Sequence, residues 1–186
     1  MVVESLEPRR FLSGSPTIEL TSCGVLVVTG TCGNDTLFIT ESDGISGRQF
    51  DVATQDETGL VPLASVPESM VKRVDVIGLD GADFLVLQTS GPVGGDVWGD
   101  GGSDEIHLQD DANALSTGHG GSGDDLIVIF AGRGTSAFGD SGNDTLISFE
   151  DTNLTLLFGG SGNDVLQGTD HTFMFGGAGH DTVTTT

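Results

Sequence analysis

The chain of 186 residues is long enough for one domain and short for two, and its 28 acidic residues face only 6 lysines and arginines. The formal net charge of −22 excludes nucleic acid and anionic lipid as natural partners and favours cations. The sequence has no run of 18 or more apolar residues, so it predicts no membrane-spanning helix.

Residues 1–16 are interpreted as an N-terminal tail or sorting segment, because they lack the basic start and apolar core of a secretory signal. Within them, LEPRRFLS at 6–13 resembles the short LEPR-type motif of bacterial surface and secreted proteins. The resemblance implies an extracellular or cell-surface location. A disordered tail is the alternative interpretation.

Residues 17–75 are expected to form N-terminal β coils with a hairpin excursion. The runs TIEL at 17–20, VLVVTG at 25–30, DTLFIT at 35–40 and RQFDVAT at 48–54 are typical of strands. The stretch ESDGISGR at 41–48 is typical of a hairpin tip. We expect the strands of 17–28 to leave an open edge at this end of the domain.

Two cysteines, Cys23 and Cys32, flank the predicted strand GVLVVTGT. A strand of this length separates them by roughly 20 Å, which exceeds the roughly 4.4–6.8 Å between the Cα atoms of a disulfide. We therefore expect no bond between them. They are either partly buried free thiols or thiols that pair between molecules.

Residues 76–186 repeat a glycine-and-aspartate phrase with a period near 20 residues, which predicts a solenoid. The copies begin at Gly78, Gly99, Gly120, Gly139, Gly159 and Gly176, with an earlier degenerate copy at Gly30. The sixth position of each copy is an aspartate: Asp35, Asp83, Asp104, Asp125, Asp144, Asp164 and Asp181. Two residues later comes an aliphatic column that we expect to form the core: Leu37, Leu85, Ile106, Ile127, Leu146, Leu166 and Val183.

The copies GGSGDDLIV at 120–128, GGSGNDVLQ at 159–167 and GGAGHDTVT at 176–184 resemble the RTX-type nonapeptide of calcium-binding β-rolls. The copies at 78–86, 99–107 and 139–147 keep the fourth and sixth positions but lack the second glycine. The resemblance implies an all-β parallel β-roll or β-solenoid in which Ca²⁺ lies between stacked loops. About five inter-loop sites follow by analogy.

The implied calcium ligands are the sixth-position aspartates and the glycines of the loops. They are Asp83, Asp104, Asp125, Asp144, Asp164, Asp181, Gly99, Gly120, Gly139, Gly159, Gly176, Gly123, Gly142, Gly162 and Gly179. Glycine permits the positive φ that turns carbonyl oxygens toward a cation. Stacked carboxylates repel one another without an ion, so folding and calcium binding are expected to be one event.

The period is about twice that of a nine-residue roll, so we expect about 20 residues per coil and calcium loops on one edge only. The opposite edge is expected to turn around Asp110, Arg133, Asp151 and Asp170. The residues just before each glycine start form a further column: Ile77, Trp98, His119, Phe138, Phe158 and Phe175. Strand alternation points this column outward if Val76 and its equivalents point inward. Alternatively, the rings fill a widened core.

No catalytic constellation is visible, and we expect no enzyme. His107, His119, His171 and His180 do not share a spacing suited to zinc, and Asp124 with Asp125 fits calcium ligation better than a glycosidase pair.

Three functional classes remain. The first, which we favour, is a calcium-dependent surface or extracellular structural protein that assembles with itself head to tail into filaments. The second is an accessory module for secretion, folding or polysaccharide binding of a larger secreted protein, which should be attached to a catalytic domain. The third is an ice-binding solenoid, for which Ser116, Thr135, Thr155 and Thr172 form only a partial ladder.

Overall fold

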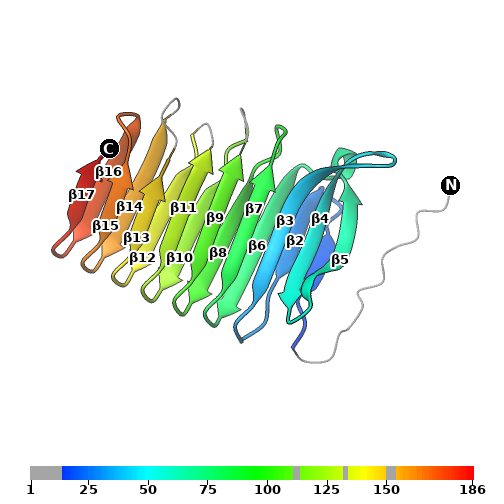
Figure 1. Cartoon of the computed structure of the whole chain (residues 1–186), viewed down its shortest axis with the longest axis horizontal. Helices are drawn as coiled ribbons and strands as arrows, with labels where there is room; N and C mark the ends of the chain where they lie inside the picture. The colour runs from blue at the N-terminus through cyan, green and yellow to red at the C-terminus, as the bar shows by residue number, and fades with distance from the viewer. Residues whose placement is uncertain (1–13, 111–113, 132–133, 150–153) are drawn as a thin grey trace.

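The computed structural model describes residues 14–110, 114–131, 134–149 and 154–186, and it forms an elongated all-β solenoid (Figure 1). One turn of 3-10 helix, η1, covers Glu68–Met70. The strands are β1 (Thr17–Leu20), β2 (Val25–Thr29), β3 (Thr36–Gly44), β4 (Gly47–Asp56), β5 (Gly59–Pro67), β6 (Arg73–Asp80), β7 (Phe84–Thr89), β8 (Gly95–Gly101), β9 (Glu105–Asp110), β10 (Thr117–Ser122), β11 (Leu126–Ala131), β12 (Ser136–Ser141), β13 (Thr145–Ser148), β14 (Thr155–Ser161), β15 (Val165–Gly168), β16 (Thr172–Ala178) and β17 (Thr182–Thr185).

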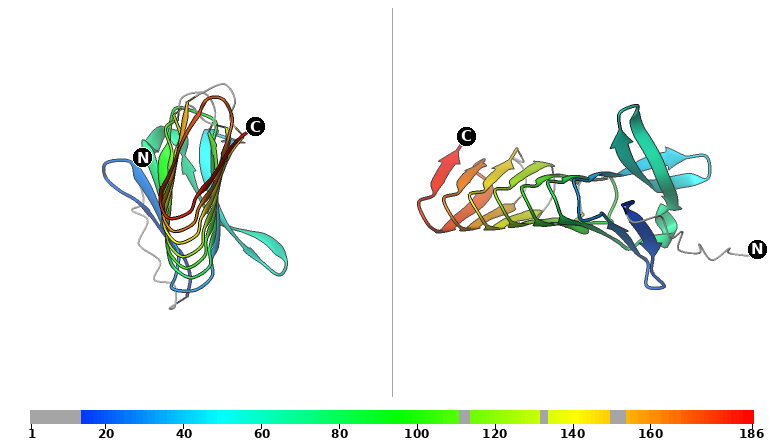
Figure 2. Two further views of the ribbon diagram at one scale, coloured as in Figure 1. Left: turned by 90° about the vertical axis from the view of Figure 1, so that its left-hand side faces the viewer. Right: turned by 90° about the horizontal axis from the view of Figure 1, so that it is seen from below.

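Two sheets face each other across the core (Figure 2). Sheet A has the order β1-β2-β6-β8-β10-β12-β14-β16, and sheet B has the order β17-β15-β13-β11-β9-β7-β3-β4-β5. From β6 onward the chain alternates between the sheets, and each strand pairs in parallel with the strand one coil away. The fold is a parallel β-solenoid with about 21 residues per turn and about five turns, which confirms the predicted fold class.

The core consists of side chains that alternate inward along both sheets. In sheet B the predicted aliphatic column is fully buried from Leu37 to Leu166. In sheet A the facing column contains Val76, Val97, Gly118, Ala137 and Leu157, which are also buried. Gly118 fits here because a Cβ at this position would lie 3.2 Å from Leu108 Cδ1 and 3.3 Å from Ile127 Cγ2. Large side chains of sheet B therefore fill the space that small residues of sheet A leave.

The column before each glycine start points outward, so the interpretation that its rings fill the core is wrong. The rings of Trp98, His119, Phe138, Phe158 and Phe175 stack along the solenoid with centroid separations of 6.1, 4.8, 4.8 and 4.9 Å. Their planes differ by at most 12°. We call this set the aromatic column. Because the rings are stacked, each covers the face of its neighbour and shows its edge to solvent.

Antiparallel strands cover the N-terminal end of the solenoid. β1 pairs antiparallel with β2, and β3, β4 and β5 form an antiparallel meander that extends sheet B. β1 covers β2, and the outermost strands are β1 in sheet A and β5 in sheet B, so the open edge expected along 17–28 lies at β1. Pro62 and Pro67 in β5 have no N–H to donate to a further strand.

An ion pair between exposed Arg48 and the buried side chain of Glu41 lies where the β3–β4 hairpin meets the first regular coil. Arg48 Nη2 lies 2.9 Å from Glu41 Oε1, and the Glu41 side chain is only 1% exposed. The backbone N–H of Ser90 donates to Glu41 Oε2 at 2.6 Å, and Arg48 also donates to the Ser90 hydroxyl. These contacts join the hairpin, which projects from the body of the solenoid in Figure 2, to the turn after β7.

The C-terminal coil, in contrast, exposes apolar side chains. Phe173 is 59% exposed, and Phe175 and Val183 are each 51% exposed. β16 and β17 are the outermost strands of sheets A and B at this end. The two ends of the described solenoid therefore differ in both backbone pairing and apolar exposure.

The two cysteines can be compared with their prediction, whereas several other predicted residues lie outside the described part of the chain. Cys23 and Cys32 are free, as their predicted separation requires, but both are exposed rather than partly buried. The LEPR-type motif at 6–13, Arg133 and Asp151 lie outside the described residues. In the described part of the chain, no helix is long and apolar enough to cross a membrane.

The alternation of inward and outward side chains makes a direct prediction for β13. Leu146→Ala removes a fully buried side chain and is expected to lower the free energy of unfolding by about 2–5 kcal/mol. Ile147→Ala changes the neighbouring, outward-facing residue and is expected to cost less than half as much. Urea unfolding of both variants at one pH measures the difference, and equal costs would contradict the assigned faces.

Candidate metal site along the aspartate edge

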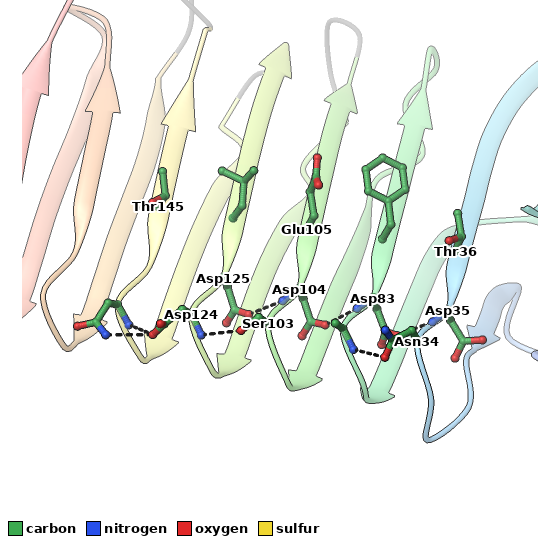
Figure 3. Close-up of a pocket in the computed structure, with 14 residues that line it drawn as sticks. Asn34, Asp35, Thr36, Asp83, Ser103, Asp104, Glu105, Asp124, Asp125 and Thr145 are labelled. Carbon is green, nitrogen blue, oxygen red and sulfur yellow. Dashed lines mark hydrogen bonds between the residues drawn. The ribbon is translucent and has the colours of Figure 1, made fainter.

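The loops that lead from sheet A to sheet B bring all the predicted aspartates together along one edge. Asp83, for example, lies between β6 and β7, and Asp104 lies between β8 and β9. We call the row of Asp35, Asp83, Asp104, Asp125, Asp144, Asp164 and Asp181 the aspartate ladder. Figure 3 shows its first members, from Asp35 to Asp125, side by side along a groove of about 650 Å³.

Each loop takes its shape from left-handed backbone at two positions. In the six loops from Gly78 onward, the second residue has φ between 69° and 113°, and it is glycine in three loops and Leu79, Asp100 or Asp140 in the others. The fourth residue is always a glycine, with φ between 126° and 141°. These two residues reverse the chain within six positions.

The glycines predicted as calcium ligands lie in these loops. Close packing between neighbouring loops is enough to require glycine at these positions, whether or not an ion binds. A Cβ on Gly123 of one loop would lie 1.7 Å from the carbonyl oxygen of Gly102 in the loop before it. A Cβ on Gly99 would lie 2.2 Å from Asp104 Oδ2 and 2.6 Å from the Gly120 carbonyl oxygen. Gly120, Gly139, Gly159, Gly176, Gly142, Gly162 and Gly179 make equivalent close approaches. Only glycine fits these positions at the observed spacing.

The aspartate ladder is held by hydrogen bonds that run in one direction. The backbone N–H of each ladder aspartate donates to Oδ1 of the aspartate in the following loop. The six bonds, from Asp35–Asp83 to Asp164–Asp181, measure 2.7 to 3.0 Å. One carboxylate oxygen per coil is thereby used to join neighbouring loops.

A second ladder, which we did not predict from the sequence, runs in the opposite direction at the fifth loop position. Here the side-chain oxygen of one loop accepts the N–H of the following loop, as in Asn143 N–H to Asp124 Oδ1 at 2.7 Å and Asn163 N–H to Asn143 Oδ1 at 3.0 Å. Asn34, Ser103 and Asn163 accept in the same way. The recurrence of Asn, Ser or Asp at this position was the available signal. The two ladders together join neighbouring loops from both sides, except between the loops of Ala82 and Ser103, because alanine has no side-chain acceptor.

The second carboxylate oxygen of the ladder is left without a partner in five coils. The Oδ2 atoms of Asp83, Asp104, Asp125, Asp144 and Asp164 are buried and have no hydrogen-bond partner among the described residues. The five residues are at most 3% exposed. A buried carboxylate oxygen without a donor is unfavourable unless the group is protonated or a cation lies nearby.

Burial raises the pKa of the ladder carboxyl groups. It raises the pKa of Asp125 to about 7 and that of Asp83 and Asp144 to about 6, and neighbouring aspartates add to each increase by charge repulsion. The pKa of Asp104 is raised for the same reasons. The raised pKa values show that the surrounding protein disfavours the charged form of these carboxyl groups.

The donor set along this edge fits a hard cation. Carboxylate and carbonyl oxygens are the groups that Ca²⁺ prefers, and the row contains no sulfur or imidazole ligand in its sixth positions. Within the described residues, no group of three or more His, Cys, Asp or Glu is arranged to hold a metal by itself. An ion on this edge would therefore need oxygen ligands beyond the carboxylates of a single loop.

The opposite edge contains a buried carboxylate with a different environment. Asp110, at the end of β9, accepts hydrogen bonds from the hydroxyls of Thr89 and Ser116 at 3.0 Å and of Thr135 at 3.1 Å. These residues come from three neighbouring coils, so Asp110 joins the coils through hydroxyl groups. Asp170 is exposed in the turn after β15. The partial ladder of Ser116, Thr135 and Thr155 is buried and cannot form an ice-binding face.

The histidines do not converge. His107 Nε2 lies 2.8 Å from Glu105 Oε1 on sheet B, and His119 stacks in the aromatic column of sheet A.

Comparisons with protein-family models, curated proteins and solved structures found no match to this chain. The functional argument therefore depends on the aspartate edge itself.

The raised pKa values predict how stability depends on pH when no divalent cation is present. An unperturbed aspartate has a pKa of 3.8, and burial raises the folded-state pKa of Asp125 to about 7. Between about pH 4 and pH 7 the folded state holds more protons than the unfolded state, so the free energy of unfolding falls as the pH rises. We expect chelator-treated protein to be less stable at pH 8 than at pH 5 in urea unfolding.

Asp125→Asn removes one titrating group and is expected to reduce this pH dependence. Asp170→Asn, on the exposed opposite edge, provides the matched control and should leave it unchanged. A stability in chelator that stays constant from pH 5 to pH 8 would contradict the prediction.

Proposed function

We propose that the chain is a calcium-dependent structural protein and that Ca²⁺ binds along the aspartate ladder. The observation that carries the proposal is the set of five buried Oδ2 atoms without a partner. Bound Ca²⁺ supplies the positive charge that compensates these oxygens. The resemblance of the loops to RTX-type nonapeptides supports the same ion, and the parallel solenoid is the architecture that this resemblance implies.

The residues of the chain have separate roles in this proposal. The Oδ2 atoms of the ladder face the cation, while the Oδ1 atoms keep the loops in register by accepting hydrogen bonds from the preceding coil. The left-handed second and fourth positions set the loop shape that presents backbone oxygens. The proposed role is binding and structural, not catalytic.

We place this function outside the bacterial cell or at its surface. Extracellular calcium modules work at dissociation constants of roughly 10⁻⁴–10⁻³ M, which suits sites shared between loops. A formal charge of −22 disfavours the compact state through self-repulsion unless cations are abundant.

The exposed C-terminal coil leads us to propose end-to-end self-association. β16 and β17 offer open backbone groups there, next to the exposed Phe173, Phe175 and Val183. At the other end β1 is the outer strand of sheet A and carries no proline, whereas β5 contains Pro62 and Pro67. Head-to-tail contact through the β16 and β1 edges would propagate into a filament.

The alternative, an accessory module that binds polysaccharide or assists secretion or folding of a larger protein, receives less support. Sugar rings stack on the open faces of aromatic side chains. In the aromatic column most ring faces are covered by the next ring, about 4.8 Å away in the Phe138–Phe158 pair. The column is therefore better suited to reinforcing the stack of coils.

Calcium binding can be tested with a variant that separates charge from hydrogen bonding. Asp144→Asn keeps an Oδ1 acceptor for the Asp125 N–H but removes one buried charge. We expect calcium affinity, measured by calorimetry, to fall about tenfold or more, because ligand charge sets the affinity of calcium sites. In chelator the same variant should be more stable than wild type, since an uncompensated charge is gone.

Asp170→Asn is the matched control and should change neither quantity. Identical circular dichroism spectra of the wild type in excess chelator and in calcium, with no heat of binding, would overturn the calcium proposal.

The filament proposal has its own test. Light scattering in millimolar calcium should increase with protein concentration and return to the monomer value when chelator is added. Asp181→Lys, in the last loop, is expected to abolish this growth, whereas Asp170→Lys makes the same charge change away from that loop and should not. A monodisperse monomer at every concentration would rule the filament out.

A further inference from the structure

The degenerate first loop, residues 30–35, satisfies its aspartate without any ion. Asp35 Oδ2 accepts two hydrogen bonds from Thr31, one from the backbone N–H at 2.5 Å and one from the hydroxyl at 2.9 Å. The equivalent oxygens of the next five loops have no partner among the described residues. Asp35 is thus the one ladder member whose Oδ2 is shown with donors from its own loop.

The backbone of this loop also differs from the backbone of the others. Thr31 occupies the second position, and neither Thr31 nor the fourth-position Gly33 adopts the positive φ that all six later loops show at both positions. The Thr31 hydroxyl also accepts the Gly33 N–H at 3.2 Å, which holds the loop in this second shape. One residue therefore determines both the conformation of the loop and the donors that reach Asp35.

We propose that Thr31 takes the place of a cation in the first coil, so that the calcium column begins at Asp83 and excludes Asp35. The inference rests on the proposed function, since it concerns where that column ends. The two Thr31 donors occupy the oxygen that an ion would need, and the loop lacks the left-handed residues that present carbonyl oxygens in the other coils.

The sequence allows a direct test, because one substitution completes the repeat. Thr31→Gly converts GTCGND into GGCGND, which has glycine at the first, second and fourth positions like the loops at Gly120, Gly159 and Gly176. We expect equilibrium dialysis against ⁴⁵Ca²⁺ to show one more ion per chain than in the wild type. Asp35→Asn added to Thr31→Gly should remove the additional ion.

Two further variants keep the proposal testable if Thr31→Gly does not fold by circular dichroism. Asp35→Asn in the wild-type chain should leave the number of bound ions unchanged, whereas Asp144→Asn should reduce the number or the affinity. Thr31→Val removes the hydroxyl donor but keeps the branched shape, and it should lower the urea midpoint in chelator without adding an ion.

The outcomes separate this inference from the proposed function. A wild type that binds no Ca²⁺ overturns the proposed function and, with it, the boundary assigned to Thr31. A wild type that binds Ca²⁺ while a folded Thr31→Gly binds the same number overturns the role of Thr31 alone. A loss of bound ions in Asp35→Asn would also overturn it, since Asp35 would then belong to the column.

Discussion

The burial of one carboxylate per coil, repeated at the spacing of a parallel sheet, is the constraint on which this structure depends. Strands of a sheet lie about 4.8 Å apart, so stacked loops cannot move their aspartates away from one another. The hydrogen bond that Oδ1 accepts from the preceding coil fixes each carboxylate in place and leaves Oδ2 buried in the loop. The same contacts that hold the coils in register therefore concentrate the negative charge.

This constraint also explains why glycine is required along the edge. The sequence interpretation gave the glycines a role in turning carbonyl oxygens toward an ion. The structure adds a stricter reason, because the fourth-position glycines pack so closely that a Cβ on Gly142 would lie 1.8 Å from the Gly123 carbonyl oxygen. The two reasons agree, since close stacking and left-handed backbone are both needed to bring backbone oxygens near the carboxylates.

The regular part of the fold follows from the sequence because its information is local and periodic. The aspartate and the aliphatic residue two positions later fix an edge and an inward face in every coil, and strand alternation then places the aromatic column outside. The N-terminal meander could not be derived in this way. Its register depends on long-range contacts such as the Glu41–Arg48 pair with Ser90, which no repeat encodes.

Two polar features of the site were missed for different reasons. The fifth-position ladder is visible as recurring Asn, Ser and Asp, but its opposite direction depends on side-chain geometry that a repeat pattern does not contain. The Asp110 cluster combines two different positions of the coil: Ser116 and Thr135 come shortly before a glycine start, whereas Thr89 and Asp110 come at the end of a strand of sheet B. The repeat shows each position separately, but it does not show that the two meet across the turn.

These features make the two ends of the described solenoid differ from each other and from its middle. At the N-terminal end Asp35 has donors from Thr31, and antiparallel strands cover the first coil. Along the middle, five successive coils each bury one carboxylate oxygen that has no hydrogen-bond partner among the described residues. At the C-terminal end the core column itself becomes exposed at Val183. The first coil of the described solenoid therefore satisfies its aspartate and its strand edges with its own residues, whereas the last described coil exposes both its apolar side chains and its backbone edges.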